Sequence, residues 1–265
     1  MNDVTTTTVA APRPCGKWLR MRRLFAGDGR MLIVAMDHAL YLGPANGLDL
    51  ETAAEAAAAG ADAIMTSFGA ARGMRDRTLE LHGAAVVVSL DTDATDPERQ
   101  LINALKLGAD AVKVYVAGSE AAQWRSLSAY AQVCEQWAVP LLAEVIPGGF
   151  DQPEHHTPTA IAHACRRAAE LGADLVKTLY TGDPDTMAQV VQGATVPVVI
   201  LGGEVAQSMR ELTDRVRDAC RAGVAGIAFG RNIWASPHPA ATVTALAQAV
   251  HGPPTTTAAA GVTHQ

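Results

Sequence analysis

The chain has 265 residues, of which 49% are hydrophobic and 18% are charged, and its formal net charge is −6 with a pI near 5.7. This acidic balance argues against a surface that binds nucleic acid or anionic membranes, because such surfaces are basic. No apolar run reaches the ~18 residues of a membrane span, and the four cysteines form no C-x-x-C pair, a usage that suits the reducing cytoplasm.

We expect both ends of the chain to be disordered. Residues 1–14 include four consecutive threonines, and residues 252–265 are rich in Pro, Thr and Ala. Neither end can bury enough apolar surface to offset the entropy of ordering. Residues 15–251 between them form one predicted domain, in which short β-type runs alternate with longer Ala-rich helical runs.

This alternation predicts a parallel sheet with helices outside it. In chain order the predicted strands are Met31–Asp37, Asp62–Ser67, Ala84–Leu90, Asp110–Val116, Pro140–Ile146, Asp174–Tyr180, Val196–Leu201 and Gly226–Gly230. The clearest predicted helices are Pro97–Leu107, Glu120–Trp137, Thr157–Leu171 and Gln207–Ala222. Eight such units predict a single (β/α)8 TIM barrel. An open doubly wound sheet is the main alternative, but no Gly-x-Gly-x-x-Gly follows the first strand.

The first predicted strand ends in Asp37, followed by His38. A carboxylate at the carboxyl end of a barrel strand faces the mouth of the barrel, where it can move protons or orient a substrate hydroxyl. A role in capping or in a turn is the alternative for Asp37.

An internal repeat sets the register of the even-numbered strands. The segments Gly60-Ala61-Asp62-Ala63-Ile64, Gly108-Ala109-Asp110-Ala111-Val112 and Gly172-Ala173-Asp174-Leu175-Val176 share one pattern, with a looser copy at Gly223-Val224-Ala225-Gly226-Ile227. The next residues are Met65, Lys113, Lys177 and Ala228. Because alternate strands of such a barrel contribute the side chains of one interior layer, we predict that Lys113 lies near Lys177.

Lys177 is the most informative single residue, because a lysine in an otherwise apolar strand is rarely buried without a partner or a task. Two neighbouring ammonium groups repel in a low-dielectric interior, so we expect at least one of Lys113 and Lys177 to have a lowered pKa. A free amine of this kind suits Schiff-base chemistry. The structural alternative is that each lysine pairs with a buried carboxylate such as Asp37 or Glu144.

Glycines follow the last two strands, as Gly202-Gly203 and as Gly230 before Arg231. Loops at these places in TIM barrels often hold a phosphate through backbone N–H groups, and an arginine can clamp two oxygens. Tight turns and a surface charge are the alternative interpretation.

Two other clusters suggest a metal only superficially. Asp91, Asp93 and Asp96 lack the glycine and distal glutamate of a Ca²⁺ loop, so we expect a helix cap before Pro97. His155-His156 has no third ligand at a convincing spacing. We therefore expect neither a metal nor a cofactor.

At four places the sequence resembles the class I aldolases of the archaeal fructose-bisphosphate aldolase and aminodideoxyheptulosonate synthase type, a DeoC-like family. The matching segments are Met36-Asp37-His38 with Gly43-Pro44 and Gly47-Leu48, Asp174–Gly182 around Lys177, Gly202-Gly203, and Gly226–Trp234. The resemblance implies that Lys177 forms the Schiff base, that Asp37 takes part in proton transfer and hydroxyl binding, and that the glycine loops bind phosphate. It also implies a homo-oligomer.

The sequence departs from that family in two places. Ile146 stands where relatives carry an acid/base tyrosine, so Glu144, two residues earlier on the same strand face, is the candidate to supply the proton. Lys113 and Glu144 together are more similar to the tagatose-bisphosphate aldolase branch. Glu204 follows the glycine pair where relatives often have proline and lysine, and a carboxylate disfavours a neighbouring phosphate.

The leading hypothesis is a cofactor-free lyase that uses Lys177, with Asp37, Glu144 and Lys113 as further catalytic candidates. It would act on an aldehyde and a phosphorylated ketone such as dihydroxyacetone phosphate, in sugar-phosphate cleavage or in a biosynthetic aldol condensation with an unusual acceptor. The alternatives are a metal-dependent aldolase and a sugar-phosphate-binding barrel without turnover.

Overall fold

The computed structural model describes residues 16–44, 48–74, 83–118 and 121–252. The predicted disordered ends therefore lie outside the described residues, apart from Gly252. In the described part no helix is both long and apolar enough to cross a membrane.

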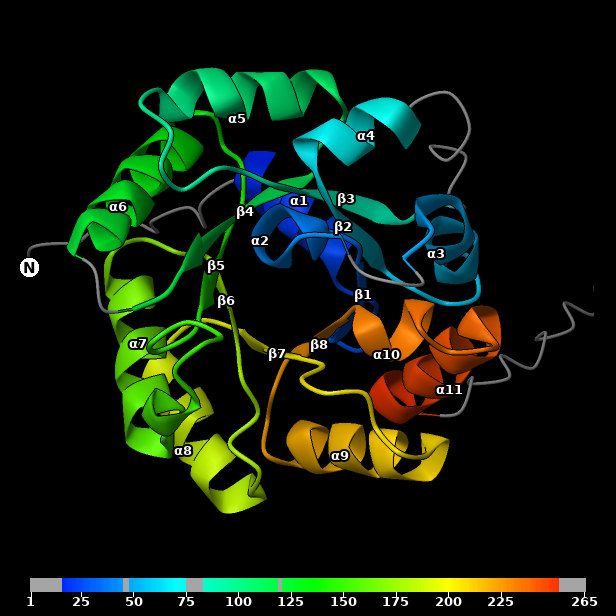
Figure 1. Ribbon diagram of the computed structural model, residues 1–265. Coiled ribbons are helices and arrows are strands. Elements are labelled where there is room, and N and C mark those ends of the chain that lie inside the picture. The colour runs from blue at the N-terminus through cyan, green and yellow to red at the C-terminus, as the bar shows by residue number, and fades with distance from the viewer. Residues whose placement is uncertain (1–15, 45–47, 75–82, 119–120, 253–265) are drawn as a thin grey trace, which may run out of the picture.

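Eight parallel strands close into a barrel in sequence order, and helices surround it (Figure 1). The strands are β1 Met31–Ala35, β2 Ala63–Ser67, β3 Ala85–Ser89, β4 Ala111–Val116, β5 Leu141–Val145, β6 Leu175–Thr178, β7 Val198–Leu201 and β8 Gly226–Phe229. The predicted (β/α)8 barrel is confirmed, and the open doubly wound sheet is excluded because β1 pairs with both β2 and β8.

The helices follow the strands along the chain, and α1 precedes them. They are α1 Gly16–Leu24, α2 Ala39–Leu42, α3 Leu50–Ala57, α4 Phe68–Met74, α5 Pro97–Lys106, α6 Ala121–Gln136, α7 Pro158–Glu170, α8 Pro184–Ala194, α9 Met209–Arg221, α10 Arg231–Trp234 and α11 Pro239–His251, with a 3-10 turn at Pro153–His155. Several begin at a side-chain cap, for example Asp96 on the amide of Arg99 and Ser208 on that of Glu211. Such caps satisfy amides that have no partner inside the helix.

Closure of the barrel depends on a glycine. Gly226, the first residue of β8, has φ +148°, and a Cβ there would lie 1.9 Å from the carbonyl oxygen of Met31. Only a residue without a side chain permits this close approach of β8 to β1.

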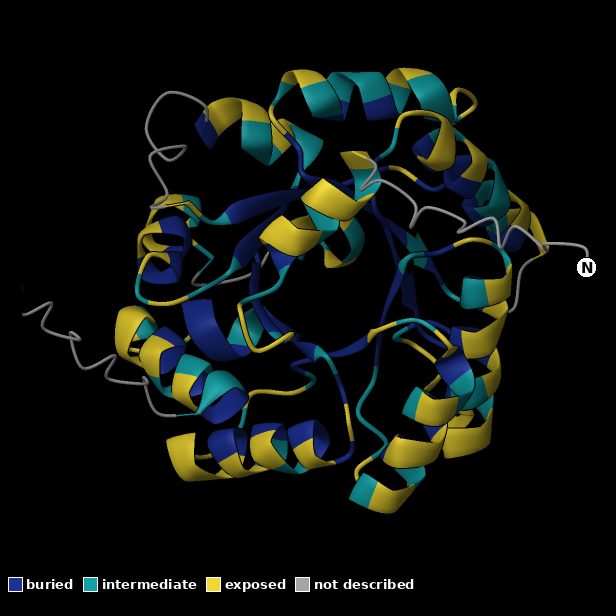
Figure 2. Ribbon diagram, turned by 180° about the vertical axis from the view of Figure 1, so that it is seen from behind, coloured by how far each residue is buried: buried dark blue, intermediate teal, exposed yellow. Residues whose placement is uncertain are grey.

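The core has two shells. Side chains on the outer face of the strands pack against the helices, whose far faces are exposed (Figure 2). A smaller cluster, including Met31, Met65 and Val199, fills the inside of the barrel. Leu24 of α1 belongs to this inner cluster, so α1 closes the end of the barrel where the strands begin. The opposite end, where the strands finish, is left open for a site.

Candidate active site

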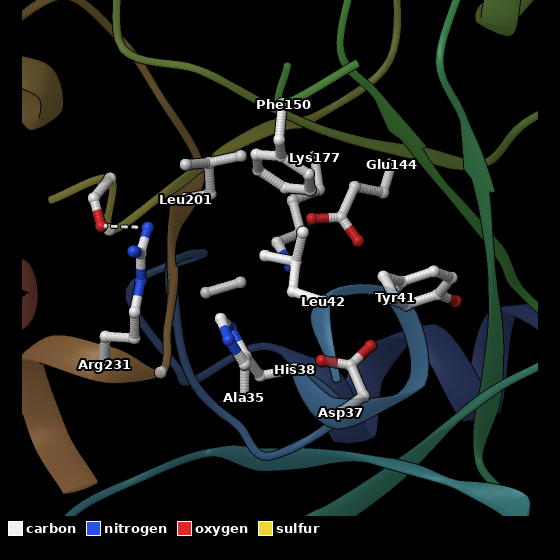
Figure 3. A pocket seen from close by; sticks show the side chains of 14 residues that line it. Ala35, Asp37, His38, Tyr41, Leu42, Glu144, Phe150, Lys177, Leu201 and Arg231 are labelled. Carbon is white, nitrogen blue, oxygen red and sulfur yellow. Dashed lines mark hydrogen bonds and ion pairs between the residues drawn. The ribbon is translucent and has the colours of Figure 1, made fainter. Parts of the chain in front are cut away.

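The carboxyl ends of the strands surround one cavity of about 70 Å³ (Figure 3). Every predicted site residue except Lys113 lines it: Asp37, Glu144, Lys177, Gly202, Gly203, Gly230 and Arg231. Ala228, which the repeat places in the inward-facing layer, lies in the same wall, together with residues that had no predicted site role: Ala35, His38, Tyr41, Leu42, Phe150 and Leu201. Residues from five different strand ends thus meet in one place, as the topology of the barrel requires.

A chain of ion pairs joins the four predicted catalytic side chains. Lys177 Nζ lies 2.7 Å from Glu144 Oε1, and Lys113 Nζ lies 2.5 Å from Glu144 Oε2. Lys113 Nζ also lies 2.8 Å from Asp37 Oδ2. The order is therefore Lys177, Glu144, Lys113, Asp37, with the charges alternating. All four are buried, and Lys113 is completely inaccessible to solvent.

The alternation of side chains along the strands explains why the lysines and Glu144 meet inside the barrel. Lys177 pairs in register with Glu144 on the neighbouring strand, and Lys113 pairs with Ser89. Because every second side chain of a barrel strand points inward, these four residues face the interior together. Lys177 Nζ also lies 3.8 Å from Met65 Sδ, the residue that the repeat places on strand β2. The predicted nearness of Lys113 and Lys177 is confirmed, with Glu144 between them.

The alternating charges determine the protonation states. Burial alone raises the pKa of Asp37, but the charges of Lys113 and Lys177 outweigh burial and hold that pKa at about 2. Burial acts on Glu144 in the same way, and the same two lysines lower its pKa. Lys113 does not have the lowered pKa that was expected for at least one of the two lysines. Burial does oppose its charge, yet Asp37 and Glu144 raise the pKa well above its ordinary value.

Ser89 is a polar neighbour that the sequence analysis missed. Its hydroxyl donates to Asp37 Oδ2 at 2.5 Å, on the oxygen that Lys113 also contacts. The signal was present, because Ser89 is the one polar residue that ends the apolar strand β3 and has inward parity. Together Ser89 and Lys113 fix the orientation of the Asp37 carboxylate.

The structural alternative, in which both lysines pair with carboxylates, describes the contacts correctly. It does not explain their position, since Lys177, Glu144 and Asp37 all line the cavity. A structural role fits Lys113 best, because this lysine lies behind the cavity wall and contacts the carboxylates of both Asp37 and Glu144.

The two glycine loops form the opposite side of the cavity, and Asn232 holds them together. Its Nδ2 donates to the carbonyls of Gly202 and Glu204, both at 3.1 Å, and its Oδ1 accepts from the amide of Ala206 at 2.9 Å. Arg231 Nη2 donates to the carbonyl of Gly203 at 2.9 Å. These contacts fix the loop after β7 against the loop after β8.

Glycine is required at two of these positions. Gly203 has φ +63°, a left-handed conformation that other residues rarely adopt. A Cβ on Gly230 would lie 2.6 Å from the carbonyl oxygen of Ala35. The loops therefore present backbone and one guanidinium to the cavity, which is the chemistry of an anion site.

Ile146 and Glu204 are the two positions at which the sequence departs from the family pattern, and the structure places them differently. Ile146 is fully buried and does not line the cavity, so no acid/base group stands at that position. The side chain of Glu204 is exposed and is not part of the cavity wall, so its carboxylate does not line the cavity. The concern about a carboxylate beside a phosphate is thereby reduced.

An aromatic cluster lies beside the carboxylates. The ring centroids of Tyr41 and Tyr115 are 5.1 Å apart, and Phe150 stacks on Tyr115 at 5.8 Å. Lys113 Nζ lies 4.1 Å from the centre of the Tyr41 ring, a cation–π contact. Burial raises the pKa of Tyr41 to about 12 and that of Tyr115 to about 12, so both stay neutral. Tyr41 comes from the four-residue helix α2 and Phe150 from the loop after β5, and neither is long or regular enough for a periodic pattern to predict direction.

The two clusters weighed as metal sites have other roles. Asp96 caps α5, as expected, and His156 Nε2 lies 2.8 Å from the carbonyl of Gly149. In the described part of the chain no three His, Cys, Asp or Glu side chains come together as metal ligands would.

The cavity thus combines a buried amine, a carboxylate within proton-transfer distance of it, and an anion clamp on the facing side. An amine so placed can add to a carbonyl, and the carboxylate can accept its proton.

Comparison with known proteins agrees with this chemistry. A sequence model described as DeoC/LacD family aldolase matches residues 31–236. A 2-amino-4,5-dihydroxy-6-oxo-7-(phosphonooxy)heptanoate synthase of Streptomyces griseus is 36% identical, over 92% of this chain and 93% of the relative. A 2-amino-3,7-dideoxy-D-threo-hept-6-ulosonate synthase of Halobacterium salinarum is 35% identical, over 89% and 92%. Among solved structures, an archaeal fructose-1,6-bisphosphate aldolase with its catalytic lysine bound to a carbinolamine intermediate is similar with a TM-score of 0.76 and 28% identity, covering 88% of this chain and 99% of that one.

Proposed function

The chain belongs to the DeoC/LacD aldolase family and is an aldolase of the Schiff-base class, and we propose that Lys177 is the residue that forms its imine. The observation that carries this assignment is the position of Lys177. Its Nζ lines the cavity at the carboxyl ends of the strands and lies 2.7 Å from a carboxylate that can accept its proton. Lys113, the other lysine of the network, lies outside the cavity wall and keeps its proton because its pKa is raised.

The proposed reaction begins when Lys177 transfers a proton to Glu144 and its amine adds to the ketone of the donor. The resulting carbinolamine loses water and leaves a protonated imine. The imine withdraws electrons, so a base can remove a proton from the neighbouring carbon and form an enamine. The enamine carbon attacks the aldehyde, whose oxygen takes up a proton, and water then hydrolyses the imine to release the product.

Glu144 is the proposed proton carrier. It contacts Lys177 with one oxygen and Lys113 with the other, so Lys113 holds the carboxylate in place while the oxygen beside Lys177 can take the proton. This role replaces the tyrosine that Ile146 displaces. Because Glu144 and the reacting amine are in direct contact, no further group is needed for the first transfer.

Asp37 has a different proposed task. Its pKa is held at about 2, and its ion pair is with Lys113, whereas Glu144 is the carboxylate paired with Lys177, so Asp37 stays ionised and accepts hydrogen bonds. Its contacts with Lys113 and Ser89 both fall on Oδ2. We assign its Oδ1 to a hydroxyl of the substrate.

The donor in this proposal is a phosphorylated ketone, with dihydroxyacetone phosphate as the simplest member. Gly203, Gly230 and Arg231 on the side facing the carboxylates support a phosphate there. The Streptomyces relative is named for a product that carries one phosphate on carbon 7, next to its keto group.

The acceptor is proposed to be an aldehyde that carries an amino group. The loops after β3 and β5, residues 91–96 and 147–157, contain five carboxylates and neither lysine nor arginine. An acidic rim on that side of the mouth attracts a cationic acceptor and repels a second phosphate. Both heptulosonate-type relatives are named for products with a 2-amino group. The proposed direction is therefore biosynthetic C–C bond formation.

The experiment is an assay of dihydroxyacetone phosphate with a panel of amino aldehydes and phosphorylated aldehydes, with products identified by mass. Wild-type enzyme should form an adduct with an amino aldehyde, EDTA should leave the rate unchanged, and Lys177→Met should abolish it. A rate lost with EDTA and kept in Lys177→Met would indicate a metal-dependent aldolase. Donor binding without any adduct would indicate a non-catalytic sugar-phosphate-binding barrel.

The homo-oligomer and the cytoplasmic location implied by the sequence stay predictions. Light scattering of the purified protein measures the first, and fractionation of the source cells measures the second.

A further inference from the structure

His38 is a cavity residue to which neither the sequence analysis nor the proposed reaction gives a task. It follows Asp37 and lines the same cavity, where its imidazole lies between Arg231 and Asp37 (Figure 3). Its backbone carbonyl accepts from the amides of Tyr41 and Leu42, at 3.2 and 3.0 Å, so the position of His38 is tied to the turn of α2.

The ring of His38 belongs to the phosphate side of the cavity. It packs edge-on against Trp234 of α10, with the centroids 5.6 Å apart and the planes at 69°. Arg231, from the same short helix, is close enough to influence its charge. Burial and then Arg231 lower the pKa of His38, so at pH 7 the ring is neutral and one ring nitrogen carries a hydrogen. Within the described residues, the ring makes no hydrogen bond, which leaves that N–H for a ligand.

A phosphate at this place can accept a hydrogen bond from a further side chain. Of the cavity side chains that carry an N–H, Lys177 is consumed by the imine and Arg231 already directs Nη2 to the carbonyl of Gly203. A phosphate offers three acceptor oxygens and a charge between −1 and −2 near pH 7. Among the described residues of the cavity wall, His38 is the remaining side chain with an N–H.

We propose that His38 is a second side-chain ligand of the donor phosphate, donating a ring N–H beside the guanidinium of Arg231. This inference rests on the proposed function, since it assumes a phosphorylated ketone held on Lys177. It gives the site a preference for phosphorylated donors that the glycine loops alone would not provide, because a hydrogen bond to a charged group is stronger than one to a neutral group.

The test compares dihydroxyacetone phosphate with unphosphorylated dihydroxyacetone. Borohydride trapping at Lys177 is measured against donor concentration for wild type, His38→Ala and His38→Gln. His38→Ala should raise the half-saturating concentration of dihydroxyacetone phosphate on the order of 10- to 100-fold and leave that of dihydroxyacetone within about twofold. His38→Gln keeps an N–H donor and should recover part of the loss. His163→Ala, an exposed histidine on α7, is the matched control and should behave as wild type.

Each other outcome has a distinct meaning. If trapping occurs but His38→Ala and wild type respond equally to the phosphorylated donor, the inference is wrong and the proposed function stands. If the maximal trapping rate falls equally with both donors at unchanged half-saturation, His38 moves protons and the inference is also wrong. If wild type traps neither donor, the proposed function fails, and the inference with it. Melting temperatures of the variants show that each is folded.

Discussion

Glu144 lies between two ammonium groups, 2.7 Å from Lys177 Nζ and 2.5 Å from Lys113 Nζ, and it is almost completely buried. Removing one partner of a buried ion pair leaves an uncompensated charge, which costs more than the pair contributes. Substitution of any residue of the ion-pair network should therefore be harmful, but some substitutions should mainly reduce turnover and others mainly reduce stability.

Glu144→Gln should mainly damage turnover. The amide cannot accept the proton of Lys177, so kcat should fall by about 10²- to 10⁴-fold, the usual contribution of a positioned acid/base group. Steady-state kinetics measure this effect. Glu204→Gln, an exposed acid beside the phosphate loop, is the control and should keep kcat within about twofold. A Glu144→Gln enzyme with normal kcat would remove Glu144 from the mechanism.

Lys113→Met should mainly damage stability. It leaves Asp37 and Glu144 as neighbouring buried carboxylates, and the free energy of unfolding should fall by about 3–5 kcal/mol. Urea denaturation at pH 7 measures the loss, with Lys106→Met, at an exposed position in the last turn of α5, as the control. A fall in the free energy of unfolding below about 1 kcal/mol would mean that the ion pairs of Lys113 contribute little to stability.

At the scale of elements, the sequence predicts the strands and their inward parity well. Lys177, Lys113, Glu144 and Asp37 could be brought together because strand period and barrel topology fix their direction. Ser89 was missed although the same rule applies to it. His38, Tyr41 and Phe150 could not be placed. His38 directly precedes the four-residue helix α2, Tyr41 lies in it, and Phe150 lies in the loop after β5, so tertiary packing sets the direction of these side chains.

The loop between β7 and α9 depends on Asn232, a single side chain that bonds to three backbone groups of residues 202–206. Asn232→Ala removes these bonds and should raise KM for dihydroxyacetone phosphate about 5- to 100-fold, since buried backbone groups lose their partner. KM for dihydroxyacetone should change much less. An equal rise for both donors would show a general loss of structure.

A substitution at Gly226 tests whether pairing of β8 with β1 closes the barrel. Gly226→Ala places a methyl group 1.9 Å from the Met31 carbonyl in a left-handed conformation, so β8 can no longer pair with β1 and folded protein should be lost. Gly69→Ala is the control, because a Cβ there meets nothing within 4 Å and alanine favours a helix. Circular dichroism and gel filtration distinguish the two variants. A well-folded Gly226→Ala protein would contradict this account of closure.

At the scale of the whole molecule, a histidine at the end of the last helix contacts two aspartates at the end of the barrel where the strands begin. His251 at the end of α11 lies 3.1 Å from Asp62 and 2.9 Å from Asp28, which flank the start of β2 and the approach to β1. The hydrogen bond to Asp62, against burial and with help from Asp28, raises the pKa of His251 above its ordinary value of 6.5. This contact makes the stability of the chain depend on pH.

A raised folded-state pKa means that the folded protein holds the proton more tightly than the unfolded chain. The stabilisation by charged His251 is thus complete below about pH 6.5 and is lost as the pH rises through the folded-state pKa. The difference in urea midpoint between wild type and His251→Gln should be largest near pH 6 and shrink toward pH 9. A difference that grows with pH would contradict this assignment.

The whole barrel places one reactive amine at its open end, and trapping that amine tests the central claim most directly. Wild-type enzyme is treated with dihydroxyacetone phosphate and borohydride, digested, and analysed by mass spectrometry. We predict one donor-dependent reduced adduct, on the peptide that contains Lys177, and none in Lys177→Met. A catalytically competent enzyme whose Lys177 peptide stays unmodified, or an adduct on Lys113 instead, would contradict the account.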